Sequence, residues 1–303
     1  MKKPLLSIII PTFNRAKELD LCLKALDEQS LSKKEFEILV VNDGSKDKTA
    51  EVLKKWEKKL PNLKSFFQNN SGQGKARNLA FKKATGNIIL FIGDDIYGTS
   101  NFLEEHLKFH KRNPEKRAAA LGLTEWYKGK KVNAYMRWLE KGGPQFAYYK
   151  LRPHRKTSFW FFYTSNISLK KDFLKKEKIL FDTDFKKYGW EDIELGYRLE
   201  KNHGLKLIYH PEALAYHDHW MEAKSLEGKM NSIAKNAPIF QNKHPELRVV
   251  PRGIKLSFMK FFSSFPFRAS SKVLSFFVPI YGKRIHWKIL SKHYFLKTLK
   301  PSQ

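Results

Sequence analysis

Two adjacent carboxylates, Asp94 and Asp95, directly follow the apolar run Ile88–Ile92. Such a short run is typical of a buried β-strand, so both side chains emerge where a strand ends. Carboxylates held there repel each other and lose solvation. A divalent cation relieves both problems, and oxygen ligands suit Mg²⁺ or Mn²⁺ that bridges to substrate phosphates. A solvated turn that caps the next segment explains the pair equally well.

Asp43 follows a second apolar run, residues 36–41, within the sequence Asn-Asp-Gly-Ser. Asn, Asp and Gly favour tight turns, and taken alone the residues favour that interpretation. The functional alternative is a carboxylate that accepts hydrogen bonds from a nucleotide base or a ribose.

The loop at residues 71–78 combines two glycines with Lys75 and Arg77. Glycines let backbone N–H groups approach a phosphate, and the N-terminus of the following helix adds a favourable dipole. The loop is not a Walker A motif, because Ala76 follows Lys75 where that motif needs Ser or Thr, and no G-x-G-x-x-G fingerprint follows the first strand.

Glu191 and Asp192 open a predicted helix directly after Trp190. Acidic residues at a helix N-terminus are stabilised by the helix dipole, so capping is one interpretation. A general base beside an aromatic ring that stacks on a sugar is the other. His217 and His219 end the last predicted strand. Single histidines are more often structural, but an imidazole also suits Mn²⁺ or Zn²⁺ as a third metal ligand.

These residues are separated by elements that alternate between strand and helix periodicity. Short connections between alternating strands and helices predict an α/β fold with a mainly parallel sheet flanked by helices on both faces. In such sheets ligands bind beyond the carboxyl ends of the strands, where the polar loops lie. The predicted strands are 6–10, 36–41, 63–67, 88–92, 118–123, 164–169, 205–209 and 213–216, and the predicted helices are 16–28, 49–60, 75–84, 101–111 and 190–202.

The chain is strongly basic, with 58 Lys and Arg against 30 Asp and Glu among 303 residues and a formal net charge of +28. Such a field attracts polyanions: nucleic acid, an anionic membrane surface or phosphorylated ligands. No recognised nucleic-acid module is present, so a nucleic-acid partner is not expected, although a polyanion-binding protein is kept as the alternative function.

Residues 248–303 carry twelve Lys and Arg and no acidic residue. Phenylalanines are interleaved with these cations, which suits a segment that lies on anionic lipid. Pro266 and Pro279 exclude one long helix. A small helical cap on the catalytic domain is the other interpretation. The phenylalanines are Phe258, Phe261, Phe262, Phe265, Phe267, Phe276 and Phe277.

Cys22 is the single cysteine, so no internal disulfide forms and a reducing compartment fits. The apolar run at residues 5–10 is shorter than a signal-peptide core, and no run of about 18 apolar residues occurs. We therefore expect a cytoplasmic protein that associates peripherally with the inner face of the membrane.

Taken in order, the motifs resemble the glycosyltransferase family 2 pattern on a GT-A fold. The resemblance covers about residues 5–219 and implies a GT-A domain at 1–222, followed by a basic, aromatic-rich helical extension at 223–303. Residues 189–199 look like the acceptor-side segment of galactosyl- and N-acetylgalactosaminyl-type transferases. The stretches that carry the family resemblance are 7–15, 40–45, 74–78 and 90–95.

The resemblance implies a role for each matching residue. Asp43 would bind the base, typically uracil. Asp95 would ligate the metal as part of a D-x-D-type site, with Asp94 nearer the ribose or sugar. His217 matches a histidine that binds metal in some relatives. The residues that would border the nucleotide and its diphosphate are Pro11, Thr12, Asn14, Arg15, Lys75 and Arg77.

Asp192 would be the catalytic base, and Glu191 and Trp190 would contact the acceptor. Gly93 is a departure, because many relatives carry a further acid there, and this leaves the metal site with fewer carboxylates.

The implied function is a Mn²⁺- or Mg²⁺-dependent, inverting hexosyl- or N-acetylhexosaminyltransferase. It would move a sugar from a nucleotide-sugar, typically a UDP-sugar, to a hydroxyl of a glycan or lipid-linked acceptor in cell-surface polysaccharide or glycolipid synthesis. A sugar-binding protein with an inactive transferase fold is a further alternative, and the presence of Asp94, Asp95 and Asp192 argues against it.

Overall fold

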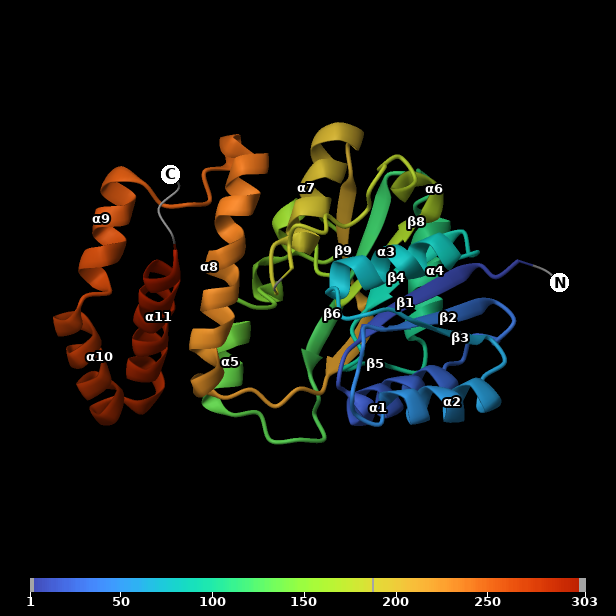
Figure 1. Ribbon diagram of the computed structural model, residues 1–303, viewed down its shortest axis with the longest axis horizontal. Helices are drawn as coiled ribbons and strands as arrows, with labels where there is room; N and C mark the ends of the chain where they lie inside the picture. The colour runs from blue at the N-terminus through green and yellow to red at the C-terminus, as the bar shows by residue number, and fades with distance from the viewer. Residues whose placement is uncertain (1–2, 187, 300–303) are drawn as a thin grey trace. The chain divides into compact units, whose positions relative to one another are not determined.

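The computed structural model describes residues 3–186 and 188–299 (Figure 1). The chain forms two compact units. Over the described residues, the first comprises 3–130, 150–186 and 191–219, and the second comprises 131–149, 188–190 and 220–299.

A parallel half-sheet forms the start of the first unit. Strands β1 (Leu6–Thr12), β2 (Phe36–Asn42), β3 (Leu63–Phe67) and β4 (Ile88–Ile92) pair in the order β3-β2-β1-β4, with every pair parallel. The register pairs Thr12 with Asn42, so β1 and β2 end level. The loops that follow these strands therefore leave from one edge of the sheet, as predicted.

Helices cover both faces of this half-sheet (Figure 1). Helices α1 (Ala16–Asp27) and α2 (Thr49–Lys59) share one buried core with Leu6, Ile8 and Ile10 of β1. Helix α3 (Gln73–Lys83) packs on β1 and β2 from the other side through its buried Ala76 and Ala80. Every residue of β1 and β2 is buried, which is why both strands read as nearly continuous apolar runs. The predicted α/β class is confirmed.

Beyond β4 the sheet becomes mixed. Over the residues that the structure describes it has nine strands in all, and the added strands include antiparallel pairs. Strands β5 and β7 were not predicted, because they are too short to show an alternation of apolar and polar residues. The added strands are β5 (Ile96–Gly98), β6 (Ala118–Trp126), β7 (Lys156–Thr157), β8 (Asn166–Lys170) and β9 (Lys206–His217), and helix α4 (Phe102–Arg112) packs on β6 and β9.

Strand β9 corrects one prediction, because residues 205–209 and 213–216 form a single strand rather than two. Its register against β6 shifts between Gly122 and Leu123, so a bulge takes up the extra residues around Pro211. Asn166 supports the bulge, since its Nδ2 donates to the carbonyl of Leu123 at 3.0 Å and to that of Ala213 at 2.9 Å.

Helix α7 (Glu191–His203) presents the predicted acidic pair in its first turn. It begins directly after Gly189 and Trp190, whose φ angles are 97° and 80°. Gly196 allows α7 to lie close to Phe162, because a Cβ at residue 196 would lie 2.6 Å from the Cβ of Phe162. The short elements η2 (Phe159–Phe161) and α6 (Lys171–Leu174) lie in the same unit.

The second unit is helical over its described residues. Trp287 packs against Tyr135 and Trp138, with ring centroids 5.3 and 5.6 Å apart. As the prolines predicted, Pro266 lies in the first turn of α10 and Pro279 begins α11. Its helices are α5 (Ala134–Glu140), α8 (Leu226–Lys243), α9 (Gly253–Phe262), α10 (Phe265–Phe277) and α11 (Pro279–Thr298), with short turns η1 (Tyr148–Lys150, which ends in the first unit), η3 (Ala223–Ser225) and η4 (Pro245–Leu247).

The compact units differ from the single predicted boundary after residue 222, because residues 131–149 and 187–190 cluster with the C-terminal helices. The boundary between a 1–222 domain and a 223–303 extension stays a prediction. Among the described residues, no helix is both long and apolar enough to span a membrane.

Candidate active site

The loops after β1 and β2 are hydrogen-bonded to each other. The N–H of Asn14 donates to Oγ of Ser45 at 2.8 Å, and the N–H of Lys46 donates to Oδ1 of Asn14 at 2.7 Å. Asn14 has a φ of 53°, a conformation that Asn tolerates better than most residues. The paired loops, together with the buried Pro11 and Thr12 at the end of β1, fix the position of Arg15, the N-cap residue of α1.

Asp43 is held by the loop that precedes α3. Its Oδ1 accepts from the N–H of Ser71 at 2.8 Å and from Nε2 of Gln68 at 2.7 Å, and its Oδ2 accepts from the N–H of Gly72 at 2.9 Å. Gly72 has a φ of 93°, which favours glycine at this position. The backbone amides that the sequence suggested for phosphate at residues 71 and 72 are therefore directed at a carboxylate of the protein.

Asp94 and Asp95 lie in the turn between β4 and β5, and both face Arg15. Nη1 of Arg15 contacts Oδ2 of Asp95 and lies 3.5 Å from Oδ1 of Asp94. Nε2 of His217 lies 3.1 Å from the same Oδ2 of Asp95. The last residue of β9, His217, pairs with Ile96 of β5 and stacks on Trp126 at 5.1 Å. The structure thus places Asp95 against His217, and Asp94 joins these two predicted metal ligands through Arg15.

The two carboxylates titrate differently. Burial and the neighbouring Asp95 raise the pKa of Asp94 to about 7. Burial alone would also raise the pKa of Asp95, but His217 and Arg15 hold it well below its ordinary value. Asp95 is therefore the more strongly anionic member of the pair.

A divalent cation fits this donor set. Carboxylate oxygens with one imidazole suit Mn²⁺, and carboxylate oxygens alone suit Mg²⁺. Both carboxylates already converge on one cation, the guanidinium of Arg15. A metal between the same oxygens would displace Arg15 from them.

A second buried group surrounds Glu191, which is 3% exposed. Nη1 of Arg77 lies 3.5 Å from its Oε1, and Nε2 of Gln73 donates to the same oxygen. Oε1 of Gln73 also accepts from Nη2 of Arg77 at 3.3 Å, and the guanidinium lies 5.3 Å from the ring centroid of Phe181. Burial lowers the pKa of Arg77, and the charges of Glu191, Asp192 and Asp94 oppose that shift. Arg77 is therefore electrostatically coupled to both acidic groups.

Asp192 lies half-buried in the first turn of α7, beside Glu191. Burial and the Glu191 carboxylate raise the pKa of Asp192 to about 7, against the opposing charge of Arg77. A carboxylate with its pKa near neutrality suits a general base, because both protonation states are accessible at the working pH.

Lys75 and Trp190 lie apart from these groups in different ways. Lys75 is exposed in the first turn of α3. Trp190 belongs to the second unit, where its indole Nε1 donates to the carbonyl of Ile233 at 2.9 Å and its ring lies 4.8 Å from Phe240. Its role toward an acceptor stays a prediction.

Some residues of the site were missed by sequence reasoning. Gln73 was missed although it lies four residues before the predicted Arg77 on α3, a spacing at which helical side chains meet, so its contact with Arg77 was detectable. Gln68, Phe181 and Trp126 carry no local signal, because only the tertiary fold brings them to Asp43, Arg77 and His217.

A sequence model described as Glycosyl transferase family 2 matches residues 7–178. This stretch is more than half of the chain and includes Asp43, Arg77, Asp94 and Asp95. The chain belongs to glycosyl transferase family 2. The resemblance of its motifs to that family is thereby confirmed.

Named relatives of this family 2 chain include sugar transferases. It is 30% identical over 271 residues to a validoxylamine A glucosyltransferase of Streptomyces hygroscopicus subsp. jinggangensis, a match that covers 80% of the chain and 62% of the relative. It is 29% identical over 219 residues to a dolichyl N-acetyl-alpha-D-glucosaminyl phosphate 3-beta-D-2,3-diacetamido-2,3-dideoxy-beta-D-glucuronosyltransferase of Methanococcus voltae, covering 69% of the chain and 65% of the relative. The chain thus spans under two thirds of the length of both.

Solved structures share the fold at low sequence identity. The mannosyltransferase PcManGT of Pyrobaculum calidifontis, in complex with GDP-Man and Mn²⁺, has a TM-score of 0.66 at 16% identity and covers 100% of this chain and 89% of its own. S. aureus TarS 1-349 in complex with UDP has a TM-score of 0.56 at 20% identity and covers 98% of this chain and 93% of its own. The GT-A fold expected from the sequence is confirmed by these likenesses.

The pairing of Arg77 with Glu191 predicts a measurable coupling. Arg77→Met should lower the free energy of unfolding by about 3–5 kcal/mol, because it leaves Glu191 buried without its cation. The double variant Arg77→Met/Glu191→Leu should recover most of that loss. Urea unfolding of the single and double variants measures the coupling.

Lys55→Met is the control for this experiment, because Lys55 pairs with Asp20 at 2.9 Å on the surface, with a side chain that is 64% exposed. Its loss should cost about 1 kcal/mol or less. Additive effects of the Arg77 and Glu191 substitutions would contradict the coupling.

Proposed function

We propose that this chain transfers a hexosyl or N-acetylhexosaminyl residue from a nucleotide-sugar to a hydroxyl of a glycan or lipid-linked acceptor. The carrying observation is the pair of acidic groups in the first unit: Asp94 and Asp95 converge on the guanidinium of Arg15, and Asp192, beside the Arg77–Glu191 pair, has a pKa raised to about 7. Asp94 and Asp95 suit a metal that holds the leaving diphosphate, and Asp192 suits deprotonation of the acceptor hydroxyl. The sugar transferases among the relatives support this assignment.

The donor side of the proposal uses Asp94, Asp95 and His217 as ligands of Mn²⁺ or Mg²⁺. When bound, the metal neutralises charge that develops on the leaving diphosphate. Arg15, displaced from the two carboxylates, pairs with the diphosphate instead, since a guanidinium matches phosphate oxygens bidentately. Lys75, exposed at the start of α3, adds charge for the same group.

Asp43 is proposed to accept a hydrogen bond from the nucleotide base, typically uracil, as the resemblance to the family implies. Its oxygens already accept three hydrogen bonds, and an ionised carboxylate offers about four acceptor positions, so one remains for a base N–H. Pro11, Thr12 and Asn14 border the same strand ends. The UDP complex of TarS supports uridine, whereas the GDP-Man complex of the Pyrobaculum mannosyltransferase makes guanosine the base to test against it.

Asp192 is the proposed catalytic base. It takes the proton of the acceptor hydroxyl as that oxygen bonds to the anomeric carbon and the bond to the diphosphate breaks. A single base that supports in-line attack inverts the anomeric configuration. Glu191, fixed by Arg77 and Gln73, orients the acceptor, and Trp190 contributes an aromatic surface.

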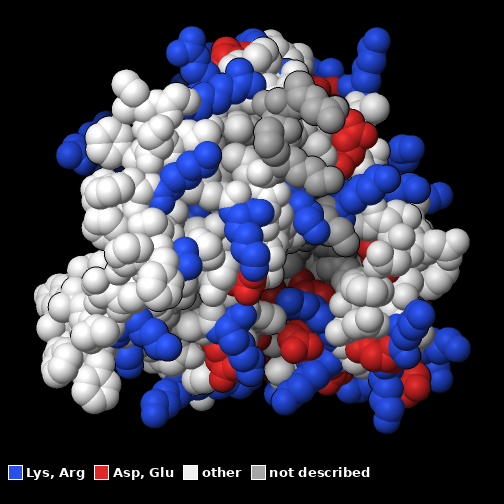
Figure 2. Space-filling view, turned by 60° about the vertical axis from the view of Figure 1, so that its left-hand side comes forward, with Lys and Arg blue, Asp and Glu red and all other residues white. Residues whose placement is uncertain are grey.

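The C-terminal helices are proposed to place the enzyme on an anionic membrane. Phe258, Phe265, Phe276 and Phe277 are between 59% and 79% exposed, among cations and without a neighbouring acid in residues 248–299. Figure 2 shows a broad white area edged by blue Lys and Arg side chains on the left of the view. Aromatic side chains that insert between headgroups, ringed by cations, fit the surface of anionic lipid. Lipid-linked acceptors would be reached there.

Donor binding tests the function directly. We expect UDP and a UDP-sugar to raise the melting temperature in Mn²⁺ but not in EDTA, and Asp95→Asn to remove the metal dependence. Asp172→Asn is the matched control, because Asp172 is exposed on α6 and its side chain is 65% accessible. Thermal shift and calorimetry with UDP, GDP and UDP-sugars measure this. Binding of nucleic acid with no response to any nucleotide would favour the polyanion-binding alternative and overturn the proposal.

The base assignment predicts a pH profile. Because Asp192 acts when ionised and its pKa is raised to about 7, kcat/KM should rise with pH through about 7 and level off above it. Glu191→Gln removes a like charge, so the rise should move to lower pH. Asp94 also has a pKa raised to about 7, but Glu191 is not among the causes of its shift, so an unmoved profile would assign the rise to Asp94.

Asp192→Asn should lower kcat by at least about 100-fold while UDP-sugar affinity stays the same, because general-base catalysis contributes 10²–10⁴-fold. Asp172→Asn again serves as the control. An equal loss of donor affinity in Asp192→Asn would show that Asp192 binds the donor.

Membrane binding is tested by co-sedimentation with vesicles. Wild-type protein should bind vesicles rich in phosphatidylserine and release from them at high salt. Phe276→Ser/Phe277→Ser should reduce binding several-fold, whereas Phe67→Ser, an exposed phenylalanine on β3 at 66% exposure, should not. Equal binding by the double variant would contradict the assignment of the C-terminal helices as the lipid surface.

A further inference from the structure

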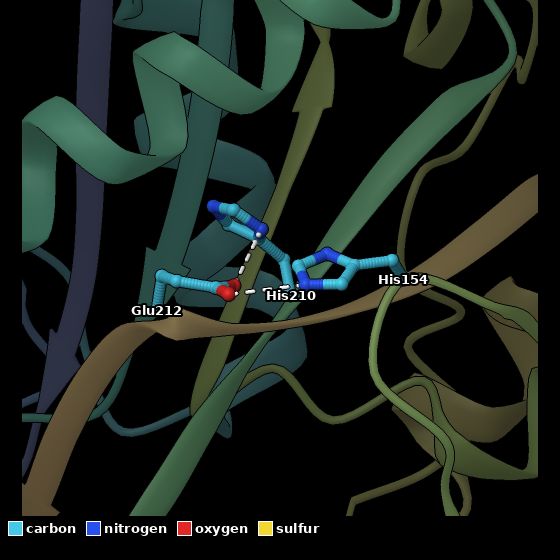
Figure 3. Close-up of side chains that lie close together, drawn as sticks. All are labelled: His154, His210 and Glu212. Atoms are coloured by element: carbon cyan, nitrogen blue, oxygen red, sulfur yellow. Dashed lines mark ion pairs between the residues drawn. The ribbon is translucent and has the colours of Figure 1, made fainter.

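Two imidazoles and a carboxylate converge in the first unit, on residues that the transferase site does not use (Figure 3). Nε2 of His154 lies 3.1 Å from Oε1 of Glu212, and Nδ1 of His210 lies 3.0 Å from Oε2 of the same carboxylate. One ligand atom from each residue lies within 4.8 Å of the other two. The carboxylate of Glu212 thus lies between two imidazoles.

The fold builds this group from two segments. His210 and Glu212 flank Pro211 at the bulge of β9, where the register against β6 shifts. His154 lies in the segment before β7, and its N–H donates to the carbonyl of Tyr209 at 2.8 Å. Because β7 pairs with β9, the two segments are held side by side by backbone hydrogen bonds. The arrangement does not depend on the long side chains alone.

A second carboxylate lies near the buried imidazole, beyond hydrogen-bond distance, and Nε2 of His210 is buried without a hydrogen-bond partner among the described residues. His210 is 3% exposed and packs against Phe109 at 5.4 Å, and its Nε2 lies 3.6 Å from Oε2 of Glu105. Lys108 holds Glu105 at 2.8 Å. Histidines that ligate metals typically direct their other ring nitrogen to a carboxylate, which fixes the ring and its tautomer.

We propose that His154, His210 and Glu212 bind a divalent transition metal of the zinc type, and that Glu105 then accepts a hydrogen bond from the buried Nε2 of His210. Ligand atoms about 2.0–2.1 Å from a tetrahedral zinc ion lie about 3.3 Å from one another. Here the imidazoles lie 3.1 and 3.0 Å from different oxygens of Glu212, and one ligand atom of each residue lies within 4.8 Å of the other two, so a small closure of the side chains would bring them to zinc distance. Two imidazoles select zinc, nickel or cobalt over Mg²⁺ and Ca²⁺. His154 and Glu212 are exposed, so a water molecule can take the fourth position.

The metal would link the segment before β7 to the bulge of β9. This link is structural, because no residue of the proposed donor or acceptor site belongs to it. Metal bound to the folded state alone stabilises that state by mass action. The first unit should therefore resist unfolding better in zinc.

The test uses full-length Asp95→Asn protein, so that the predicted donor metal site does not contribute. Calorimetry with Zn²⁺ should give one strong site per chain, and Co²⁺ should give the visible absorption of a tetrahedral complex. His154→Ala and Glu212→Gln should abolish both signals. Glu105→Gln should weaken Zn²⁺ binding by about 10–100-fold.

His203→Ala is the matched control, because Nε2 of His203 lies 3.1 Å from Oε1 of Glu177, a histidine–glutamate pair whose carboxylate also contacts Arg198 and no second histidine that the structure describes. It should leave zinc binding unchanged. Circular dichroism checks that each variant is folded. Absence of a strong zinc site in the Asp95→Asn protein, or equal zinc affinity in folded His154→Ala, would overturn the proposal and leave an ion-paired His-Glu-His group.

Discussion

Negative charge gathered at the carboxyl edge of a buried sheet is the constraint on which this structure depends. Asp94 and Asp95 follow a strand whose last four residues are buried, and neither can keep its charge there without a counter-charge. Arg15 supplies it from the start of α1. Glu191 and Asp192 likewise place two carboxylates side by side at the start of α7, and the buried Arg77 of α3 supplies their counter-charge. The cations that balance the site are thus carried by the helices that follow β1 and β3.

Carboxylates also fix the loops that surround the site. The carboxylate of Asp43 accepts hydrogen bonds from the N–H groups of Ser71 and Gly72, which fixes the backbone directly before α3. Glu37 does the same elsewhere in the sheet, where it accepts from Oγ of Ser7 at 2.6 Å and from the N–H of Gly86 at 3.2 Å. Burial alone would raise the pKa of Glu37, but these hydrogen bonds hold it below its ordinary value. In each case one acidic side chain ties together segments that are distant in the sequence.

The parallel half of the sheet was readable from the sequence because each strand is short, apolar and followed by polar turn residues. β4 was predicted with its observed bounds, and Asp94 and Asp95 with it. The sequence predictions failed where tertiary contacts override the local sequence pattern. Pro211 reads as a strand break, yet a bulge supported by Asn166 carries β9 past it. The role of Phe181 beneath Arg77 depends on a loop with no periodicity at all.

Arg15 gives the acid pair a built-in competitor. A guanidinium held against Asp94 and Asp95 would compete with the proposed metal for the same oxygens, so the metal alone would bind weakly. An anion that draws Arg15 away removes the competition, and by thermodynamic reciprocity the metal must raise the affinity for that anion by the same factor. The free energy of this coupling would reside in the ion pairs of Arg15 with Asp94 and Asp95. Metal and diphosphate would then enter the site as a cooperative unit, and a site lacking one of them would return to its own salt bridge.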